Sequence, residues 1–289
     1  MSTTLAGTAL PTASPQKAPR RPRAGHVWSA IAWLVGLIFF FPVLWMVLTG
    51  FKQESAAASN PPTIFTAPTL DQYRAIFDRD ITPYLLNSAM ASIISVLLVI
   101  VLAVPAAYAL SLRPVLKWRD VLFFFISTKM LPIVAAILPI YITVKELGML
   151  DNIWTLVVLY TAMNLPLAIW VMRSFFLEVP KELLEASALD GAGLPTQLLR
   201  VIMPIVSPGI AATALICFIF SWNEFFFAVN LTSTNAGTAP VFLVGFITSE
   251  GLFLARLCAA ATLVSLPVLI AGWIAQNKLV RGLSVGAVK

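Results

Sequence analysis

Three residues with hydrogen-bonding side chains interrupt a long apolar segment in the last third of the chain: Trp222, Asn223 and Glu224. A carboxylate at the centre of a bilayer costs about 2.5–3.5 kcal/mol on insertion scales, so Glu224 needs a partner or water. Carboxylate and amide groups hydrogen-bond to hydroxyls, and an indole face packs against the C–H face of a sugar ring. We expect this trio to line a path for a polyhydroxylated solute. The alternative is that these side chains bond to neighbouring helices or to a partner subunit.

Three further polar residues lie in apolar segments. Lys129 is the other charge at membrane depth, and it is expected either to contact the solute or to have a structural role by snorkelling or ion pairing. Asn87 and Asn164 are candidates for the same path, although hydrogen bonding between helices is the usual role of a buried amide. All three are kept as candidate path residues.

Other kinds of chemistry find little support. The single histidine, His26, precedes the first apolar segment, which argues against histidine-based catalysis and metal binding. Cys217 and Cys258 lie in apolar stretches without metal-ligand spacing and are expected to be buried thiols. The chain has no Gly-x-x-x-x-Gly-Lys-Ser/Thr sequence, so it does not bind ATP in that way.

The composition indicates an all-α integral membrane protein. Hydrophobic residues make up 59% of the 289 residues and charged residues only 11%, against about 25% charged in soluble domains. A bilayer-spanning helix needs about 20 largely apolar residues. Six segments meet this requirement: 27–51, 84–112, 121–144, 152–172, 205–231 and 257–277.

Two segments fall outside this scheme. Residues 1–26 form a tail rich in Ala, Pro, Thr and basic residues, which is expected to be disordered and cytoplasmic, leaving 27–289 as the membrane domain. A signal peptide is the alternative, but the following apolar stretch is too long and lacks a small-residue cleavage site. Residues 239–249 are apolar but too short to cross, so we expect an interfacial or re-entrant piece.

The basic residues predict the orientation. If the amino terminus is cytoplasmic, 13 of the 19 Lys and Arg residues lie in cytoplasmic segments and five lie outside. This bias is typical of the positive-inside rule. Both termini are therefore expected in the cytoplasm.

The longest polar loop on that side, residues 178–204, has the pattern of a compact helical turn. Pro180 suits the first turn of a helix, and good helix formers follow over 181–189. Gly191 and Gly193 are suited to end this helix with positive φ. A second short helix is expected over 196–203, before Pro204. An ordinary amphipathic connector is the alternative interpretation.

The order of residues in this loop resembles the coupling-loop signature of ABC importer permeases. Glu185-Ala186-Ser187, Asp190-Gly191-Ala192 and Val201-x-Met203-Pro204 carry the resemblance. Residues 147–152, 221–225 and 280–289 are similar to the carbohydrate-uptake branch of that family. From about residue 27 to the end, the chain resembles the maltose-type second permease subunit.

The resemblance implies a transport subunit, not an enzyme, with no catalytic or metal-binding residue. Glu185, Ala186, Ser187, Asp190, Gly191 and Pro204 would form the surface that meets a cytoplasmic ATPase dimer, and ATP and Mg²⁺ would be bound by that ATPase. Glu185 would be the polar anchor, Ala186 would allow close approach and Gly191 would make the turn. The other implied partners are a second permease and an extracellular or periplasmic solute-binding protein, in a bacterial cytoplasmic membrane.

The resemblance also bears on the cargo. Residues 127–132 and 246–251 look most like permeases assigned to mannitol or sorbitol, which favours a polyol among sugars and sugar alcohols. An ion-gradient-driven secondary transporter is the alternative, with Glu224 as its only buried acid. An intramembrane enzyme is disfavoured by the near absence of histidine and the lack of paired acids within the spans.

Overall fold

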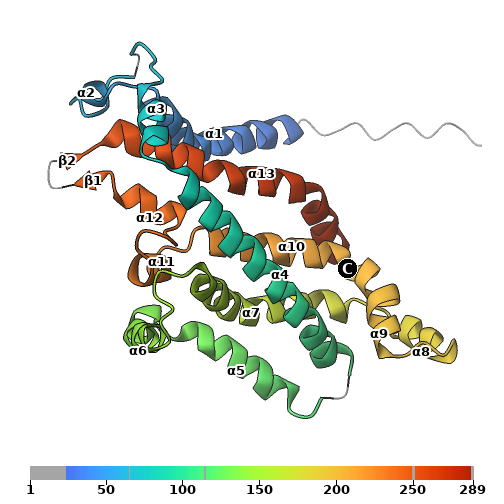
Figure 1. Ribbon diagram of the computed structural model, residues 1–289. Coiled ribbons are helices and arrows are strands. Elements are labelled where there is room, and N and C mark those ends of the chain that lie inside the picture. Colours follow the sequence, from blue (N-terminus) through green and yellow to red (C-terminus); the bar gives the residue numbers. More distant parts are fainter. Residues whose placement is uncertain (1–23, 65, 114, 249–250, 288–289) are drawn as a thin grey trace, which may run out of the picture. The chain divides into compact units, whose positions relative to one another are not determined.

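The computed structural model describes residues 24–64, 66–113, 115–248 and 251–287, and these are almost entirely helical (Figure 1). The chain divides into two compact units, Met1–Trp45 and Met46–Lys289. Helix α1 (Ala24–Gly50) begins in the first unit, so helical structure reaches the end of the expected 1–26 tail. Residues 1–23 of that tail lie outside the described residues.

Five described helices are long and apolar enough to cross a membrane. Four of them match the expected spans over 27–51, 84–112, 152–172 and 257–277, and the fifth overlaps the expected span over 205–231. They are α1, α4 (Thr82–Leu112), α7 (Ile153–Leu177), the continuous run Leu194–Trp222 that ends in α10 (Met203–Trp222), and α13 (Leu254–Ala287).

The expected span over 121–144 is not one straight helix. It consists of α5 (Trp118–Met130) and α6 (Ile133–Glu146), whose axes meet at 88°. Pro132 causes the break, because a proline disfavours helical geometry in the residue before it. Leu131 accordingly has extended φ and ψ of −69° and 125°.

The expected span over 205–231 also needs correction. Helix α10 ends at Trp222, and a separate short helix, α11 (Phe226–Leu231), follows a break. The second coupling-loop helix expected over 196–203 is not separate either. A short helix, α9 (Leu194–Thr196), leads through a π-helical turn, η1 (Gln197–Ile202), directly into α10.

The short apolar stretch over 239–249 is not one of the helices long enough to cross a membrane. It forms α12 (Ala239–Val244), followed by an antiparallel hairpin of β1 (Ile247–Thr248) and β2 (Gly251–Leu252), in which Ile247 pairs with Leu252. Two more short helices, α2 (Glu54–Ala57) and α3 (Asp71–Asp78), lie between α1 and α4.

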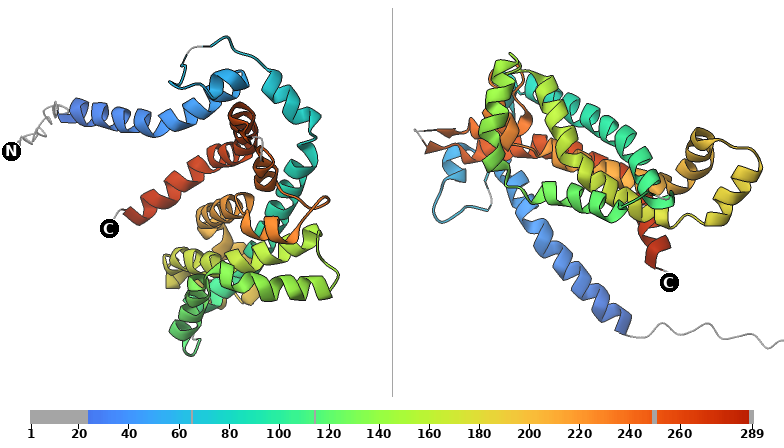
Figure 2. Two further views of the ribbon diagram at one scale, coloured as in Figure 1. Left: turned by 90° about the vertical axis from the view of Figure 1, so that its left-hand side faces the viewer. Right: turned by 90° about the horizontal axis from the view of Figure 1, so that it is seen from below.

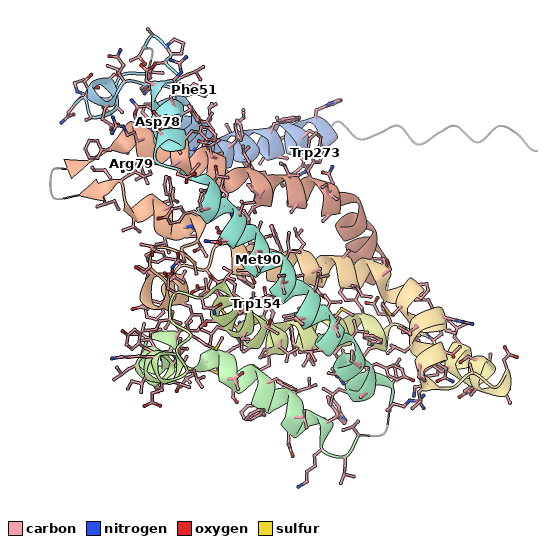
Figure 3. All side chains as sticks on the ribbon, viewed as in Figure 1. Phe51, Asp78, Arg79, Met90, Trp154 and Trp273 are labelled. Carbon is pink, nitrogen blue, oxygen red and sulfur yellow. The ribbon has the colours of Figure 1, made fainter. Side chains whose placement is uncertain are left out.

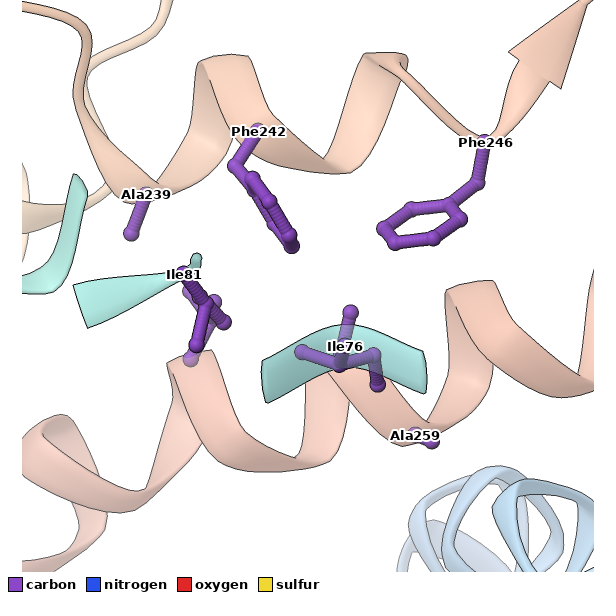
Figure 4. Packing of buried hydrophobic residues seen from close by; sticks show 8 residues of the cluster. Ile76, Ile81, Ala239, Phe242, Phe246 and Ala259 are labelled. Carbon is purple, nitrogen blue, oxygen red and sulfur yellow. The ribbon is translucent and has the colours of Figure 1, made fainter. Parts of the chain in front are cut away.

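Apolar packing and a helix cap hold these short elements against the start of α13. Ile76 and Ile81 are fully buried between α12 and α13, with Phe242 and Phe246 on one side and Ala259 on the other (Figure 4). The carboxylate of Glu54 accepts the backbone N–H groups of Ala255 and Arg256 in the first turn of α13, at 2.9 and 3.3 Å.

The centre of the second unit is built by α4, α7 and α10 (Figure 2). Buried Val99 and Ala103 of α4, Ala168 and Ile169 of α7, and Cys217 of α10 share one apolar cluster. Cys217 is therefore buried as expected, whereas Cys258 is only partly buried. Gly209 of α10 permits a very close approach, because a Cβ there would lie 2.3 Å from the ring of Phe175 in α7. Small residues of this kind let membrane helices pack tightly.

Candidate coupling loop and transport path

The loop expected to dock begins with a well-defined helix, α8 (Lys181–Leu189), beyond the end of α7 (Figure 1). Pro180 is extended and precedes the first turn. Gly191 has φ of +77°, and the N–H of Ala192 donates to the carbonyl of Ser187 at 2.9 Å. The helix expected over 181–189 and its stop at Gly191 are therefore confirmed, whereas Gly193 has φ of −71° and not the positive φ expected.

Most of the expected docking residues lie on the free surface of this loop. Glu185, Ala186, Asp190, Gly191 and Pro204 are exposed. Ser187 differs: it is 8% exposed, and its hydroxyl donates to the carbonyl of Leu184 at 2.8 Å. Ser187 thus supports the helix from its inner side.

Large apolar side chains share the outer surface of the loop. Leu189 is 89% exposed, and Leu194 and Leu199 are more than half exposed. Exposed apolar side chains of this density, beyond the end of an apolar bundle, are typical of a protein–protein contact. The geometry therefore favours docking over an ordinary connector.

A polar network joins the loop to the end of α4. Arg113, which caps α4, donates to the hydroxyl of Tyr108 at 2.6 Å and to the side-chain carbonyl of Gln197 at 2.9 Å. Tyr108 and Gln197 are both buried. None of these three residues is predicted from the sequence to have a functional role. The only signal was an arginine directly after an apolar span.

Beside this network lies a cavity of about 480 Å³ between the end of α4 and α8. Its lining brings the acidic Glu185 together with the basic Arg113 and Lys181 and with the buried Gln197. Beneath it, Tyr108, Phe176 and Ile202 belong to one buried cluster. Leu184 of α8 packs against this cluster, which joins residues of α4, α7 and η1.

Two of the expected path residues, Trp222 at the end of α10 and Glu224 just after it, are buried. The indole N–H of Trp222 donates to the carbonyl of Val264 in α13 at 3.0 Å, and Trp222 is 3% exposed. The carboxylate of Glu224 accepts the N–H groups of Phe227 and Ala228 at 2.9 and 3.3 Å. Glu224 thus caps α11, which provides the partner that a carboxylate at this depth requires.

The two asparagines also bond within the chain. Asn164 is fully buried and donates to Ser221 of α10 at 2.9 Å, which links α7 to α10. Asn87 donates to the carbonyls of Asn235 and Gly237 at 2.8 and 3.0 Å, which links α4 to the loop before α12.

Lys129 and Asn223 are the two expected path residues that remain at the surface. Lys129, one residue before the end of α5, lines a cavity of about 360 Å³ with Thr128, Met163 and Phe227. Among the described residues it forms no ion pair with a carboxylate. The amide of Asn223 lies at the break between α10 and α11, where its N–H₂ group donates to Ile219 at 2.8 Å.

A second hydrogen-bond network, which the sequence did not predict, holds the loop after α11 at the end of the bundle opposite α8. The carboxylate of Asp151 accepts the N–H groups of Ser233, Asn235 and Ala236 at 2.8, 3.0 and 2.9 Å. Partial burial raises the pKa of Asp151, but these hydrogen bonds outweigh it and lower the pKa to about 2. Within the described residues no group of three His, Cys, Asp or Glu side chains is placed to hold a metal ion.

Comparison with known proteins places this architecture in a family. Residues 99–284 match the family described as "Binding-protein-dependent transport system inner membrane component". A probable ABC transporter permease protein of Sinorhizobium fredii is 38% identical, over 91% of this chain and 95% of that protein. The trehalose transport system permease protein SugB of Mycobacterium tuberculosis is 31% identical, over 92% and 98%.

A solved structure shares the fold. One chain of a bacterial ABC transporter involved in the import of the acidic polysaccharide alginate superimposes with a TM-score of 0.71. The match covers 91% of this chain and all of that chain, at 22% identity. At that identity the likeness concerns the fold alone.

Proposed function

The chain belongs to the family of binding-protein-dependent transport system inner membrane components, and from this premise we propose how it takes part in import. It is an ABC importer permease for sugars, a transport subunit and not itself an enzyme. The proposal concerns its coupling surface, its partners and its cargo.

The exposed helix α8 is the observation that carries the coupling role. Glu185 and Ala186 are on the exposed face of α8, where Glu185 also lines the open cavity beside Arg113, and Gly191 closes the end of the helix with positive φ. We propose that this face, with Asp190 and Pro204, sits in a groove of an ATPase subunit. Exposed Leu189 provides apolar contact area and Glu185 provides a polar anchor.

Movement of the docked helix then reaches the spans through contacts of the loop. Arg113 joins Gln197 at the base of the loop to the end of α4. The apolar cluster around Phe176 joins the loop to α7. When two ATPase subunits close on ATP, α8 is displaced and α4 and α7 follow, which alternates access between the two sides of the membrane.

The proposed cargo is a sugar or sugar alcohol, with a polyol such as mannitol or sorbitol favoured by the resemblance over 127–132 and 246–251. Asn223 and Lys129 are proposed to face it, because their polar groups remain at the surface. The hydrogen bonds of Trp222, Glu224, Asn87 and Asn164 support a role in shaping the path. Binding of a sugar and polyol panel to the cognate solute-binding protein tests this proposal.

The proposed assembly contains a second permease, an ATPase dimer and an extracellular or periplasmic solute-binding protein, with both termini of this chain in the cytoplasm. An ion-gradient mechanism is not favoured. The buried acid it would require, Glu224, is occupied by two backbone N–H groups.

The test of coupling is Glu185→Arg, with Glu182→Arg as the matched control on the same helix. Both glutamates are exposed, but only Glu185 belongs to the coupling signature. We expect Glu185→Arg to abolish ATP-dependent uptake and to weaken ATPase association, while Glu182→Arg retains both. Uptake by the wild type should survive a proton uncoupler. Intact assembly and uptake in Glu185→Arg would refute the docking role of α8.

A further inference from the structure

Two guanidinium groups bracket one indole where α5 begins. The Cζ atom of Arg173 lies 4.2 Å from the ring centroid of Trp118, and the Cζ atom of Arg119 lies 5.3 Å from it. Arg173 belongs to α7, whereas Trp118 and Arg119 form the first turn of α5. We name this group the Trp118 bracket.

The bracket carries two positive charges, and Asp120 is the acidic residue of the same first turn of α5. Among the described residues neither Arg119 nor Arg173 forms an ion pair with a carboxylate. The Nε atom of Arg173 is buried and has no hydrogen-bond acceptor. A cation–π contact offsets part of the charge, at about 0.5–2 kcal/mol, but provides no hydrogen-bond acceptor. The Nε–H of Arg173 is therefore left without an acceptor, and an anionic oxygen atom would supply one.

The position of the bracket identifies the source of those oxygens. Arg173 precedes the end of α7 at Leu177 by four residues, which is roughly 6 Å at 1.5 Å per residue. The bracket is therefore set back toward the membrane from the coupling helix α8, which follows that end. Tryptophan and arginine at such a depth lie at the level of lipid head groups.

The surface next to the bracket suits acyl chains. Along α5, Val121, Phe123 and Phe124 follow Arg119, and these three side chains are 37%, 74% and 64% exposed. An apolar, aromatic surface beside a pair of arginines matches a molecule with an anionic head and hydrocarbon tails.

We propose that the Trp118 bracket binds the phosphate of an anionic phospholipid in the leaflet that faces the ATPase. The phosphate oxygens accept hydrogen bonds from Arg119 and Arg173, while the acyl chains lie along Phe123 and Phe124. A bound lipid there holds α5 against α7, next to the loop that leads to α8. The proposal does not depend on the identity of the cargo.

The test is native mass spectrometry of the complete purified transporter, titrated with dioleoylphosphatidylglycerol or with the zwitterionic dioleoylphosphatidylcholine. The variants are Arg119→Gln, whose side chain is exposed, and Arg173→Gln. The matched control is Arg79→Gln, because Arg79 also stacks on an aromatic ring, that of Phe246, at 5.3 Å. Arg79 lies at the opposite end of the bundle (Figure 3).

We expect the wild type to bind phosphatidylglycerol more tightly than phosphatidylcholine at one additional site. Each bracket variant should weaken that site about fivefold, from about 1 kcal/mol per basic residue near a charged membrane. Arg79→Gln should leave it unchanged, and millimolar inorganic phosphate should not displace the lipid.

Three results would overturn the proposal. The first is equal binding of the two lipids in the wild type. The second is unchanged phosphatidylglycerol binding in Arg119→Gln, which is the variant of the exposed side chain and needs no repacking. The third is a cross-link from Trp118→Cys to a carboxylate-bearing segment of the ATPase, which would make the bracket a protein contact.

Discussion

Asp151 shows how one carboxylate orders a loop. Three backbone N–H groups and the side-chain amide of Asn235 converge on it, so its charged form is favoured in the folded protein. With a pKa lowered to about 2, this contribution to stability is present above the unfolded pKa of about 3.9 and is lost as the pH falls toward 2.

Replacement of Asp151 by asparagine should therefore lower the stability at pH 7 by about 1 kcal/mol, after allowance for solvent screening of a partly exposed group. The difference in melting temperature between variant and wild type should shrink between pH 4 and pH 2. Asp78→Asn is the control, because Asp78 is exposed at the same end (Figure 3) and, among the described residues, its carboxylate accepts no comparable set of hydrogen bonds. A pH-independent difference for Asp151→Asn would contradict this account.

Gly209 is a second residue with a single physical reason for its identity. A methyl group there would overlap the ring of Phe175, so Gly209→Ala should force α7 and α10 apart and cost about 1–3 kcal/mol. Thermal unfolding of the purified protein measures this loss, and Phe175→Leu should partly restore it. The same substitution at Gly272 of α13 meets no atom within 4 Å and should be neutral.

At the scale of elements, a hydrogen bond joins the π-helical turn η1 to the end of α4. Gln197 is buried, and its side-chain carbonyl accepts a hydrogen bond from Arg113. Loss of a buried hydrogen-bond partner costs about 1–3 kcal/mol. Gln197→Leu should therefore leave the ATPase bound and active but reduce uptake about tenfold, because α8 would no longer move α4.

The measurement compares ATP hydrolysis with sugar uptake in proteoliposomes containing the complete transporter. Arg200→Gln is the control, since Arg200 is exposed in the same turn. Equal losses of hydrolysis and uptake in Gln197→Leu would indicate a docking defect, and unchanged uptake would show that the connection transmits nothing.

The sequence predicts the elements that have a strong local signal, but it does not predict where two of the long apolar segments break into separate helices. Length and hydropathy identified α4, α7 and α13, and Pro180 and Gly191 marked the limits of α8. The break after Leu131 was missed because averaged hydropathy does not register the restriction that Pro132 imposes.

The reading of Glu224 shows a different limit. A carboxylate in an apolar run predicts either an opening to the cargo or a bond within the protein, and the pattern alone does not decide between them. The structure shows its oxygens accepting the N–H groups of Phe227 and Ala228 where a new helix begins. The Arg113–Gln197 and Asp151 networks join residues more than 80 positions apart. Such long-range partners are invisible to local patterns.

At the scale of the whole molecule, the basic residues predict the orientation in the membrane. Thirteen of the 19 basic residues fall in the segments assigned to the cytoplasm, including the loop that carries α8. The α2–α3 segment and the hairpin should then face outward. In a background with Cys217→Ser and Cys258→Ser, we expect Asp78→Cys to react with a membrane-impermeant maleimide in intact cells. Glu182→Cys should react only after the membrane is opened. The reverse pattern would place α8 outside, where no ATPase could reach it, and would overturn the coupling role together with the orientation.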